Sequence, residues 1–344
     1  MNEYKISLSG AAAQGAPRPK NKFWLKFLGL LFLLLLVGGG FMALKVGNTF
    51  WVISERIASF LGTRTQDFPQ ADPAEQNRID ILVLGLRGEG EEYGGSLTDT
   101  LLLVSIKTDE KKVALISIPR DTYLKLPVVN RKTKINEAFE LGERAEPGGG
   151  GLFLAKRAVQ EIVGVNIDYV VSVDFRAFQE IVDQVLSGID VEVEKSFREN
   201  LQWGGIDFYV PQGIVHMDGN TALYYVRSRF TTSDFDRARR QQEVLLAMRK
   251  KASALGLAAH PEKVISILTT LGRHIRADAS ANDILKLVTL GREYASIAPE
   301  RLVIDTSTGL LASASIDGAY VLLPTTGSFI PIHDRVRNIF EETR

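Results

Sequence analysis

The chain has 344 residues, of which 41 are lysine or arginine, 41 are aspartate or glutamate, 4 are histidine and none is cysteine. The lack of cysteine excludes disulfides, zinc–thiolate sites and cysteine nucleophiles, and the few histidines argue against a histidine-built metal site. A formal net charge of +0 gives no reason to expect nucleic acid as a partner, and the length allows one large domain or two of ordinary size.

An uncharged apolar segment, residues 27–44, lies near the N-terminus. In a helix that rises ~1.5 Å per residue, it is long enough to cross the core of a bilayer. Basic residues precede it and few follow it, which predicts a cytoplasmic N-terminus. A cleaved signal peptide is the alternative, although the run is long for one and no AxA-like cleavage site follows it. We expect a cytoplasmic tail (1–22), a transmembrane helix (23–46) that crosses the cytoplasmic membrane once, a stalk or linker (47–77) and an extracytoplasmic main domain.

Two apolar runs joined by a polar turn predict a β-hairpin over residues 98–126. LLLVSI and VALISI have the character of strands, and TDEK between them is typical of a turn. If the turn centres on Asp109 and Glu110, antiparallel pairing sets Asp99 opposite Arg120, which is followed by Asp121. The open end of the hairpin then collects charges of both signs. The alternative is a surface ion pair that closes the hairpin and contributes little to stability.

The rest of the folded domain mixes strands and helices without strict alternation. DILVLGL (80–86) is typical of a strand, and the glycine-rich acidic loop after it lacks the Lys-Ser/Thr of a phosphate-binding P-loop. The spacing of apolar residues predicts helices over 152–164, 175–188 and 234–255. We therefore expect an α/β fold of mixed α+β type, in which helices flank a central β-sheet.

A cluster of arginines follows in the second half of the chain. If YYVRSRF is extended, Arg227 and Arg229 point to one face. Arg237, Arg240 and Gln241 share one face of the next helix. Converging guanidiniums repel one another, and the planar fork of arginine suits phosphate oxygens, so the cluster favours a polyanionic ligand. The alternative is a solvated basic face with internal Arg–Asp pairs.

The order of these segments resembles the LytR-CpsA-Psr family. The motifs are LTDT, SIPRDTYL, KINEAF, VDF, ALYYVRSRF and DFDRARRQQ, within residues 79–256. The N-terminal apolar segment fits the same family, and residues 257–344 resemble the C-terminal extension of one of its branches. The resemblance implies a catalytic domain over 78–256 with that extension packed on it, and a fold that holds a hydrophobic groove for a polyprenyl lipid.

The resemblance also implies an activity, that of a membrane-anchored phosphotransferase of the glycopolymer ligase type. Such enzymes take a glycan polymer from a polyprenyl pyrophosphate carrier and attach it to a cell-wall acceptor through a phosphodiester bond. The implied catalytic residues are Asp99, Arg120 and Asp121. Asp99 also holds Mg²⁺ (or Mn²⁺), and Asp121 either orients Arg120 or acts as a base. The residues implied to bind the pyrophosphate are Arg120, Arg227, Arg229, Arg237 and Gln241.

Two positions depart from the family pattern. The family often has GxDxR after the first strand, with its Asp as a second metal ligand, and this chain has Arg87 there. The arginine that commonly precedes the DT element by two positions is Leu97 here. The implied metal site is therefore weaker, absent, or rebuilt from the acidic loop, whose candidates are Glu89, Glu91 and Glu92.

Other functions stay open at this point. A non-catalytic binder of polyprenyl phosphates, or a transcriptional attenuator linked to the cell envelope, would keep the arginines, and Arg87 favours it. A polyprenyl-pyrophosphate pyrophosphatase would use the same site without an acceptor. A Ser-His-Asp hydrolase is set aside because the chain lacks a GxSxG motif. We expect no nucleic-acid partner, since only the short tail 1–22 could reach DNA.

Overall fold

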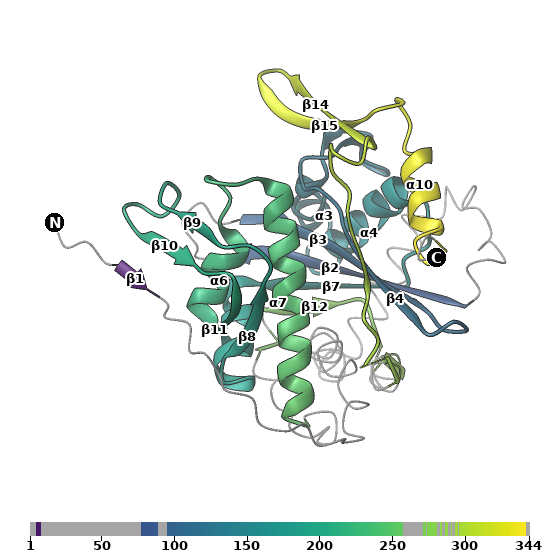
Figure 1. Cartoon of the computed structure of the whole chain (residues 1–344). Coiled ribbons are helices and arrows are strands. Elements are labelled where there is room, and N and C mark those ends of the chain that lie inside the picture. The colour runs from purple at the N-terminus through teal and green to yellow at the C-terminus, as the bar shows by residue number, and fades with distance from the viewer. Residues whose placement is uncertain are drawn as a thin grey trace. The chain divides into compact units, whose positions relative to one another are not determined.

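The computed structural model describes residues 5–7, 77–88, 95–256 and, with gaps between 272 and 296, residues 271–341 (Figure 1). The chain divides into two compact units. Phe175–Val264 form most of unit 1, and Leu33–Asp174 with Ile297–Arg344 form most of unit 2.

A six-stranded sheet forms the centre of unit 2, in the order β12-β7-β2-β3-β4-β13. β2, β3 and β4 are antiparallel neighbours, β7 is parallel to β2, β13 is parallel to β4, and β12 is antiparallel to β7. The apolar runs of β3 and β4 are buried at consecutive positions, so both faces of the sheet are covered. The strands are β2 (Arg78–Gly88), β3 (Gly95–Lys107), β4 (Lys112–Ser117), β7 (Tyr169–Asp174), β12 (Ile275–Ala277) and β13 (Glu300–Val303).

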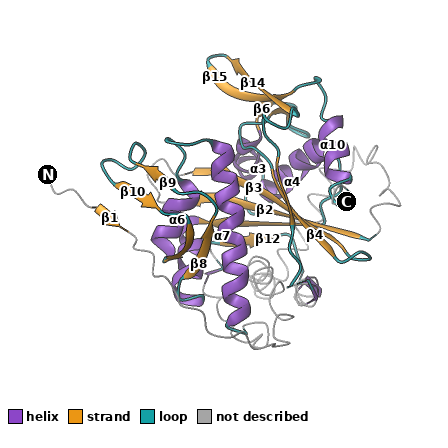
Figure 2. Cartoon of the chain, viewed as in Figure 1, coloured by secondary structure: helices purple, strands orange, loops and turns teal. Residues whose placement is uncertain are grey.

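Helices and two small hairpins complete unit 2 (Figure 2). α3 packs against α4 and β3, and α10 packs against α4. Glycines on both helices allow this close packing, since a Cβ on Gly142 of α3 would lie 2.1 Å from the carbonyl oxygen of Gly150 in α4. The remaining elements are η3 (Ile135–Glu137), α3 (Ala138–Ala145), α4 (Gly150–Val163), α10 (Ile330–Arg337), the hairpin of β5 (Tyr123–Lys125) with β6 (Lys132–Lys134), and the hairpin of β14 (Leu311–Ile316) with β15 (Ala319–Pro324).

Unit 1 combines helices with short strands. α7 packs on β8 and α6, and it begins with a capping box in which Ser233 and Asp236 satisfy each other's backbone N–H. β9 pairs with β10, β11 pairs with β8, and β1 pairs in parallel with β10. The elements are β1 (Lys5–Ser7), α5 (Phe175–Glu180) continued by the π-helical turn η4 (Ile181–Val185), β8 (Ile189–Val193), β9 (Phe197–Glu199), β10 (Asp207–Val210), β11 (Gly213–Met217), α6 (Gly219–Arg227) and α7 (Asp234–Ala254).

The structure confirms the mixed α+β fold and the hairpin, whose register runs from Lys107↔Lys112 to Leu102↔Ser117. The expectation of an extended YYVRSRF is wrong, because residues 224–227 end helix α6. The Asp218 side chain accepts from Thr221 N at 2.8 Å and caps this helix. Buried apolar side chains at helical spacing then outweigh the β-propensity of Tyr and Val.

Several expectations lie outside the described residues or stay predictions. The predicted transmembrane helix (23–46) lies outside them, and within the described part of the chain no helix is long and apolar enough to cross a membrane. The domain boundaries at 78–256 and 257–344 and the lipid groove stay predictions. We note that β12 and β13, from beyond residue 257, are strands of the central sheet.

Candidate functional site

A β-bulge in unit 2 presents Asp99. Gly85 pairs with Thr100 but the next residue, Leu86, pairs with Thr98, so Asp99 is the extra residue of β3. A bulge re-aims a side chain that regular pleating would point elsewhere. Gly85 is needed opposite the bulge, since a Cβ there would lie 2.8 Å from Cβ and Oγ1 of Thr100.

The turn after β4 carries Arg120 and Asp121, and backbone bonds hold it. Thr122 donates from its N and its Oγ1 to the carbonyl of Pro119, at 3.1 Å and 2.7 Å. Asn136 N donates to the carbonyl of Arg120 at 3.2 Å. The Arg120 side chain is 9% exposed and that of Asp99 is 15% exposed, so the pair that closes the hairpin is not the surface ion pair of the alternative interpretation.

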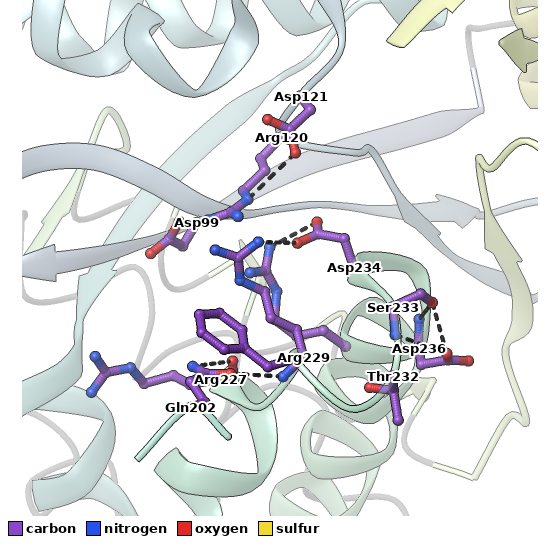
Figure 3. A network of polar contacts seen from close by, with 12 residues as sticks. Asp99, Arg120, Asp121, Gln202, Arg227, Arg229, Thr232, Ser233, Asp234 and Asp236 are labelled. Carbon is purple, nitrogen blue, oxygen red and sulfur yellow. Dashed lines mark hydrogen bonds and ion pairs between the residues drawn. The ribbon is translucent and has the colours of Figure 1, made fainter. Parts of the chain in front are cut away.

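Asp99 lies between the guanidiniums of Arg87 and Arg120. Figure 3 shows Asp99 beside Arg120 and Asp121. Arg87 Nε donates to Asp99 Oδ2 at 2.7 Å, and Arg120 Nη1 donates to Asp99 Oδ1. Asp121 accepts from Lys134 Nζ at 2.7 Å and has an oxygen 3.8 Å from Arg120 Nε. The predicted proximity of Asp99 and Arg120 is therefore confirmed. Sequence reasoning missed the contacts of Arg87 and Lys134.

A second polar pair in unit 2 lies at the end of β7. His274 Nδ1 is 2.6 Å from Asp174 Oδ2, and Asp174 N donates to the carbonyl of His274 at 3.1 Å. A Cβ on Gly88 would lie 3.2 Å from the same carboxylate oxygen. Sequence reasoning gave neither residue a role, because the two are 100 positions apart and the strand β12 that follows His274 has only 3 residues.

In unit 1, Arg227 lies between two aromatic rings. Its guanidinium carbon is 4.3 Å from the centroid of the Phe175 ring and 5.1 Å from that of Trp203. Trp203 is itself fixed by a bond from Nε1 to Ser228 Oγ at 3.0 Å. The rings hold the arginine head group in one orientation through cation–π contact.

Arg229 and Arg237 share the carboxylate of Asp234. Arg229 Nη1 is 3.7 Å from Asp234 Oδ1, and Arg237 Nη2 donates to Asp234 Oδ2 at 2.9 Å. The Arg229 side chain is 36% exposed and that of Arg237 is 6% exposed. Figure 3 labels Arg229 and Asp234. The shared carboxylate offsets the repulsion between the two guanidiniums. This part of the cluster therefore contains internal Arg–Asp pairs, as the alternative of a solvated basic face expects.

Two other side chains of α7 donate hydrogen bonds to backbone carbonyls. Arg240 is buried, donates from Nε to the carbonyl of Tyr225 at 3.1 Å and from Nη2 to the carbonyl of Ser228, and lies 4.5 Å from the Phe197 ring. Gln241 Nε2 donates to the carbonyl of Val226 at 3.3 Å. Both therefore bind the end of α6.

Sequence reasoning also missed a carboxylate that holds the segment after α6. Glu199 accepts backbone N–H bonds from Leu201, Gln202, Phe230 and Thr231, at 3.0, 3.1, 2.8 and 3.2 Å. Burial alone would raise the pKa of Glu199, but these backbone donors hold it below its usual range. The carboxylate therefore fixes the backbone next to Arg229, and no local motif could have revealed this.

The described residues do not fit a divalent cation at Asp99. Mg²⁺ takes oxygen ligands in near-octahedral geometry. Both Asp99 oxygens instead accept from arginines, and within the described residues no three His, Asp or Glu side chains group as a metal site. Glu89, Glu91 and Glu92 lie outside the described residues. The Mg²⁺ expectation therefore stays a prediction.

Residues 54–336 match the LytR_cpsA_psr family. The Oceanobacillus iheyensis protein named "Polyisoprenyl-teichoic acid--peptidoglycan teichoic acid transferase TagU" is 31% identical, over 82% of this chain and 83% of its own length. The crystal structure of B. subtilis TagV is 24% identical, with a TM-score of 0.58 over 78% of this chain and 99% of that one. The structure of TagT bound to LI-WTA is 23% identical, with a TM-score of 0.58 over 81% of this chain and 95% of that one. With most of its length matched, the chain belongs to the LytR-CpsA-Psr family.

Proposed function

We propose that the chain transfers a glycan polymer from a polyprenyl pyrophosphate carrier to a cell-wall acceptor. The observation that carries the proposal is the ion pair between Asp99, which the bulge presents, and the buried Arg120. Relatives with names such as polyisoprenyl-teichoic acid–peptidoglycan teichoic acid transferase support the substrate class. Phosphoryl transfer needs positioning and charge neutralisation more than covalent chemistry, and fixed arginines supply both.

The proposed step is a displacement at the phosphorus that bears the glycan. A hydroxyl oxygen of the acceptor forms a bond to this phosphorus, the bridging P–O bond of the pyrophosphate breaks, and polyprenyl monophosphate leaves. The hydroxyl proton passes to a base or to solvent. The product is a phosphodiester between glycan and acceptor.

The residues of unit 2 would stabilise the charge that moves in this step. Arg120 would neutralise phosphate oxygens, and Asp99 would hold Arg120 in place. Asp121, with Lys134 at 2.7 Å and Arg120 Nε at 3.8 Å, is proposed to orient Arg120 rather than to act as base. Mg²⁺, if bound, would add charge neutralisation. In unit 1, Arg227, Arg229, Arg237 and Gln241 are proposed as pyrophosphate-binding residues, as the resemblance implies.

Product analysis tests the proposal. The full-length chain is incubated with a glycan-linked polyprenyl pyrophosphate and a peptidoglycan acceptor. We expect a new glycan–acceptor phosphodiester and polyprenyl monophosphate, and at least a hundredfold loss of rate in Arg120→Ala. Arg144→Ala is the control, because Arg144 is a surface arginine paired with Glu140. Hydrolysis of the substrate to glycan phosphate and polyprenyl monophosphate, without a new phosphodiester, would establish a pyrophosphatase. Tight binding without turnover would establish a binder or regulator.

We also propose that the chain acts at the outer face of the cytoplasmic membrane. A single N-terminal anchor over 23–46 would keep the catalytic domain beside its lipid-linked substrate. The polyprenyl chain would enter a hydrophobic groove of the 78–256 domain.

A further inference from the structure

Asp99 is held by one arginine from β2 and one from the turn after β4. Its Oδ2 accepts from Arg87 Nε at 2.7 Å and its Oδ1 accepts from Arg120. We infer that Arg87 is a resident cation that takes the place of a divalent metal ion at Asp99, and that unit 2 therefore binds the substrate's pyrophosphate without metal. The inference rests on the proposed function, because it concerns the same substrate.

The charges around Asp99 favour an anion over a second cation. Within the described part of the chain, three cationic side chains, Arg87, Arg120 and Lys134, form ion pairs with the two carboxylates of Asp99 and Asp121. The Arg120 side chain is 9% exposed and that of Asp99 is 15% exposed, so water screens the group weakly. A metal ion that approached Asp99 would have to displace a guanidinium and would meet repulsion from the others.

Arginine can do at this position much of what a metal ion would do. Its charge persists across physiological pH, and its planar fork of N–H donors matches phosphate oxygens. Because Arg87 and Arg120 hold opposite oxygens of one carboxylate, Asp99 sets their spacing before the substrate arrives. Positive charge that is fixed in advance needs no reorganisation during the reaction, which is how enzymes stabilise charge in transition states.

Two binding measurements on the full-length chain test the inference. Calorimetry gives the affinity for inorganic pyrophosphate in EDTA, and electron paramagnetic resonance gives Mn²⁺ binding without pyrophosphate. We expect the wild type and the control Arg144→Ala to bind pyrophosphate equally in EDTA and to bind no Mn²⁺. Arg87→Ala should bind pyrophosphate at least tenfold more weakly, with Arg87→Lys between it and the wild type. Arg87→Asp should lose binding in EDTA and gain Mn²⁺, since it places a second carboxylate beside Asp99.

Two outcomes overturn the inference. One is a wild type that binds one Mn²⁺ per chain, or that binds no pyrophosphate once EDTA is present; Glu89, Glu91 and Glu92 would then be the first candidate ligands. The other is a pyrophosphate affinity that stays unchanged in both Arg87→Lys and a folded Arg87→Ala, while the melting temperature of Arg87→Lys also stays unchanged. Melting curves identify variants that do not fold. If Arg87→Ala and Arg87→Asp do not fold, the pyrophosphate affinity of Arg87→Lys and the Mn²⁺ binding of the wild type still decide whether the inference holds.

The inference and the proposed function fail in different ways. Metal-free pyrophosphate binding by a chain that forms no glycan–acceptor phosphodiester would leave the inference standing and overturn the transferase. Glycan transfer that stops in EDTA and resumes with Mg²⁺ would leave the transferase standing and overturn the role of Arg87.

Discussion

Arginines in unit 1 differ in what they contact, and this separates ligand-binding candidates from structural residues. Arg240 is buried and donates to backbone carbonyls, so its guanidinium replaces capping groups at the end of α6. Arg229 is 36% exposed, and its contact with Asp234 is 3.7 Å long. A ligand phosphate can reach an exposed guanidinium such as that of Arg229 and compete with Asp234 for it. A buried guanidinium that donates to backbone carbonyls, such as that of Arg240, stabilises the fold instead. Sequence spacing alone put both residues in one cluster.

Substitution of Arg229 should therefore change ligand affinity, and substitution of Arg240 should change the stability of the fold. Arg229→Ala should weaken binding of a short polyprenyl pyrophosphate at least tenfold, with a melting temperature close to that of the wild type. Arg240→Ala should cost about 3–5 kcal/mol of stability, because buried carbonyls and a packing contact lose their partner. Calorimetry and thermal unfolding check the two effects. A large loss of stability in Arg229→Ala with unchanged affinity would reverse the assignment.

Glu199 links stability to pH through four backbone donors. Its pKa is lowered in the folded chain, so its contribution is fully present above the unfolded pKa of ~4.5 and is lost as pH falls through the folded value. Glu199→Gln should lower stability by about 1–3 kcal/mol at pH 7.5, because a neutral amide cannot accept from all four N–H groups. The difference from the wild type should shrink below pH 4.5. Melting temperatures of both proteins at pH 7.5 and pH 3.5 measure this, and a gap that widens in acid would contradict it.

The bulge explains which part of the site could be predicted from the sequence. Counting outward from the turn at Asp109 placed Asp99 opposite Arg120, because β3 and β4 pair regularly up to Leu102↔Ser117. The same counting fails between β2 and β3, where the extra residue Asp99 shifts the alternation. The contact of Arg87 with Asp99 depends on that shift. A bulge leaves no reliable signal in one sequence, so this contact was found only in the structure.

Among the secondary-structure elements, length decided what could be predicted. The long periodic runs of β2, α4 and α7 were predicted within a few residues of their ends. Strands such as β5 and β12 have 3 residues each, too few to show alternation. Helix α6 was missed at its end, because Tyr and Val favour strands unless burial at helical spacing outweighs them.

The bulge in β2–β3 should depend on the absence of a side chain at Gly85. In Gly85→Ala, the new Cβ would lie 2.8 Å from Thr100 Cβ, so the strands must separate, at a cost of about 1–3 kcal/mol. The displaced Asp99 should also release Arg120 and lower pyrophosphate affinity. Thr100→Gly in the same chain removes the clash, so the double variant should be more stable than the two single effects predict. Additive losses of stability would show that the close approach is not the reason for the glycine.

The placement of the whole chain across the membrane is a prediction that the lack of cysteine makes easy to test. A single introduced cysteine can be labelled without background. Ser315 is exposed in β14 of unit 2, and Ser9 lies in the predicted cytoplasmic tail. In intact cells we expect a membrane-impermeant maleimide to label Ser315→Cys, and to label Ser9→Cys only after the membrane is opened.

Strand β1 gives this experiment a second purpose. Lys5–Ser7 pair with β10, and that pairing in the cell requires the N-terminal tail and β10 to lie on the same side of the membrane. The predicted topology separates them, because basic residues hold the tail in the cytoplasm while β10 follows the anchor. Labelling of both positions in intact cells would therefore favour the pairing and overturn the predicted orientation. A mature chain that lacks Ser9 altogether would instead show that the apolar segment is a cleaved signal peptide. If Ser315→Cys is labelled in intact cells and Ser9→Cys is not, β1 does not pair with β10 once the anchor is in the bilayer.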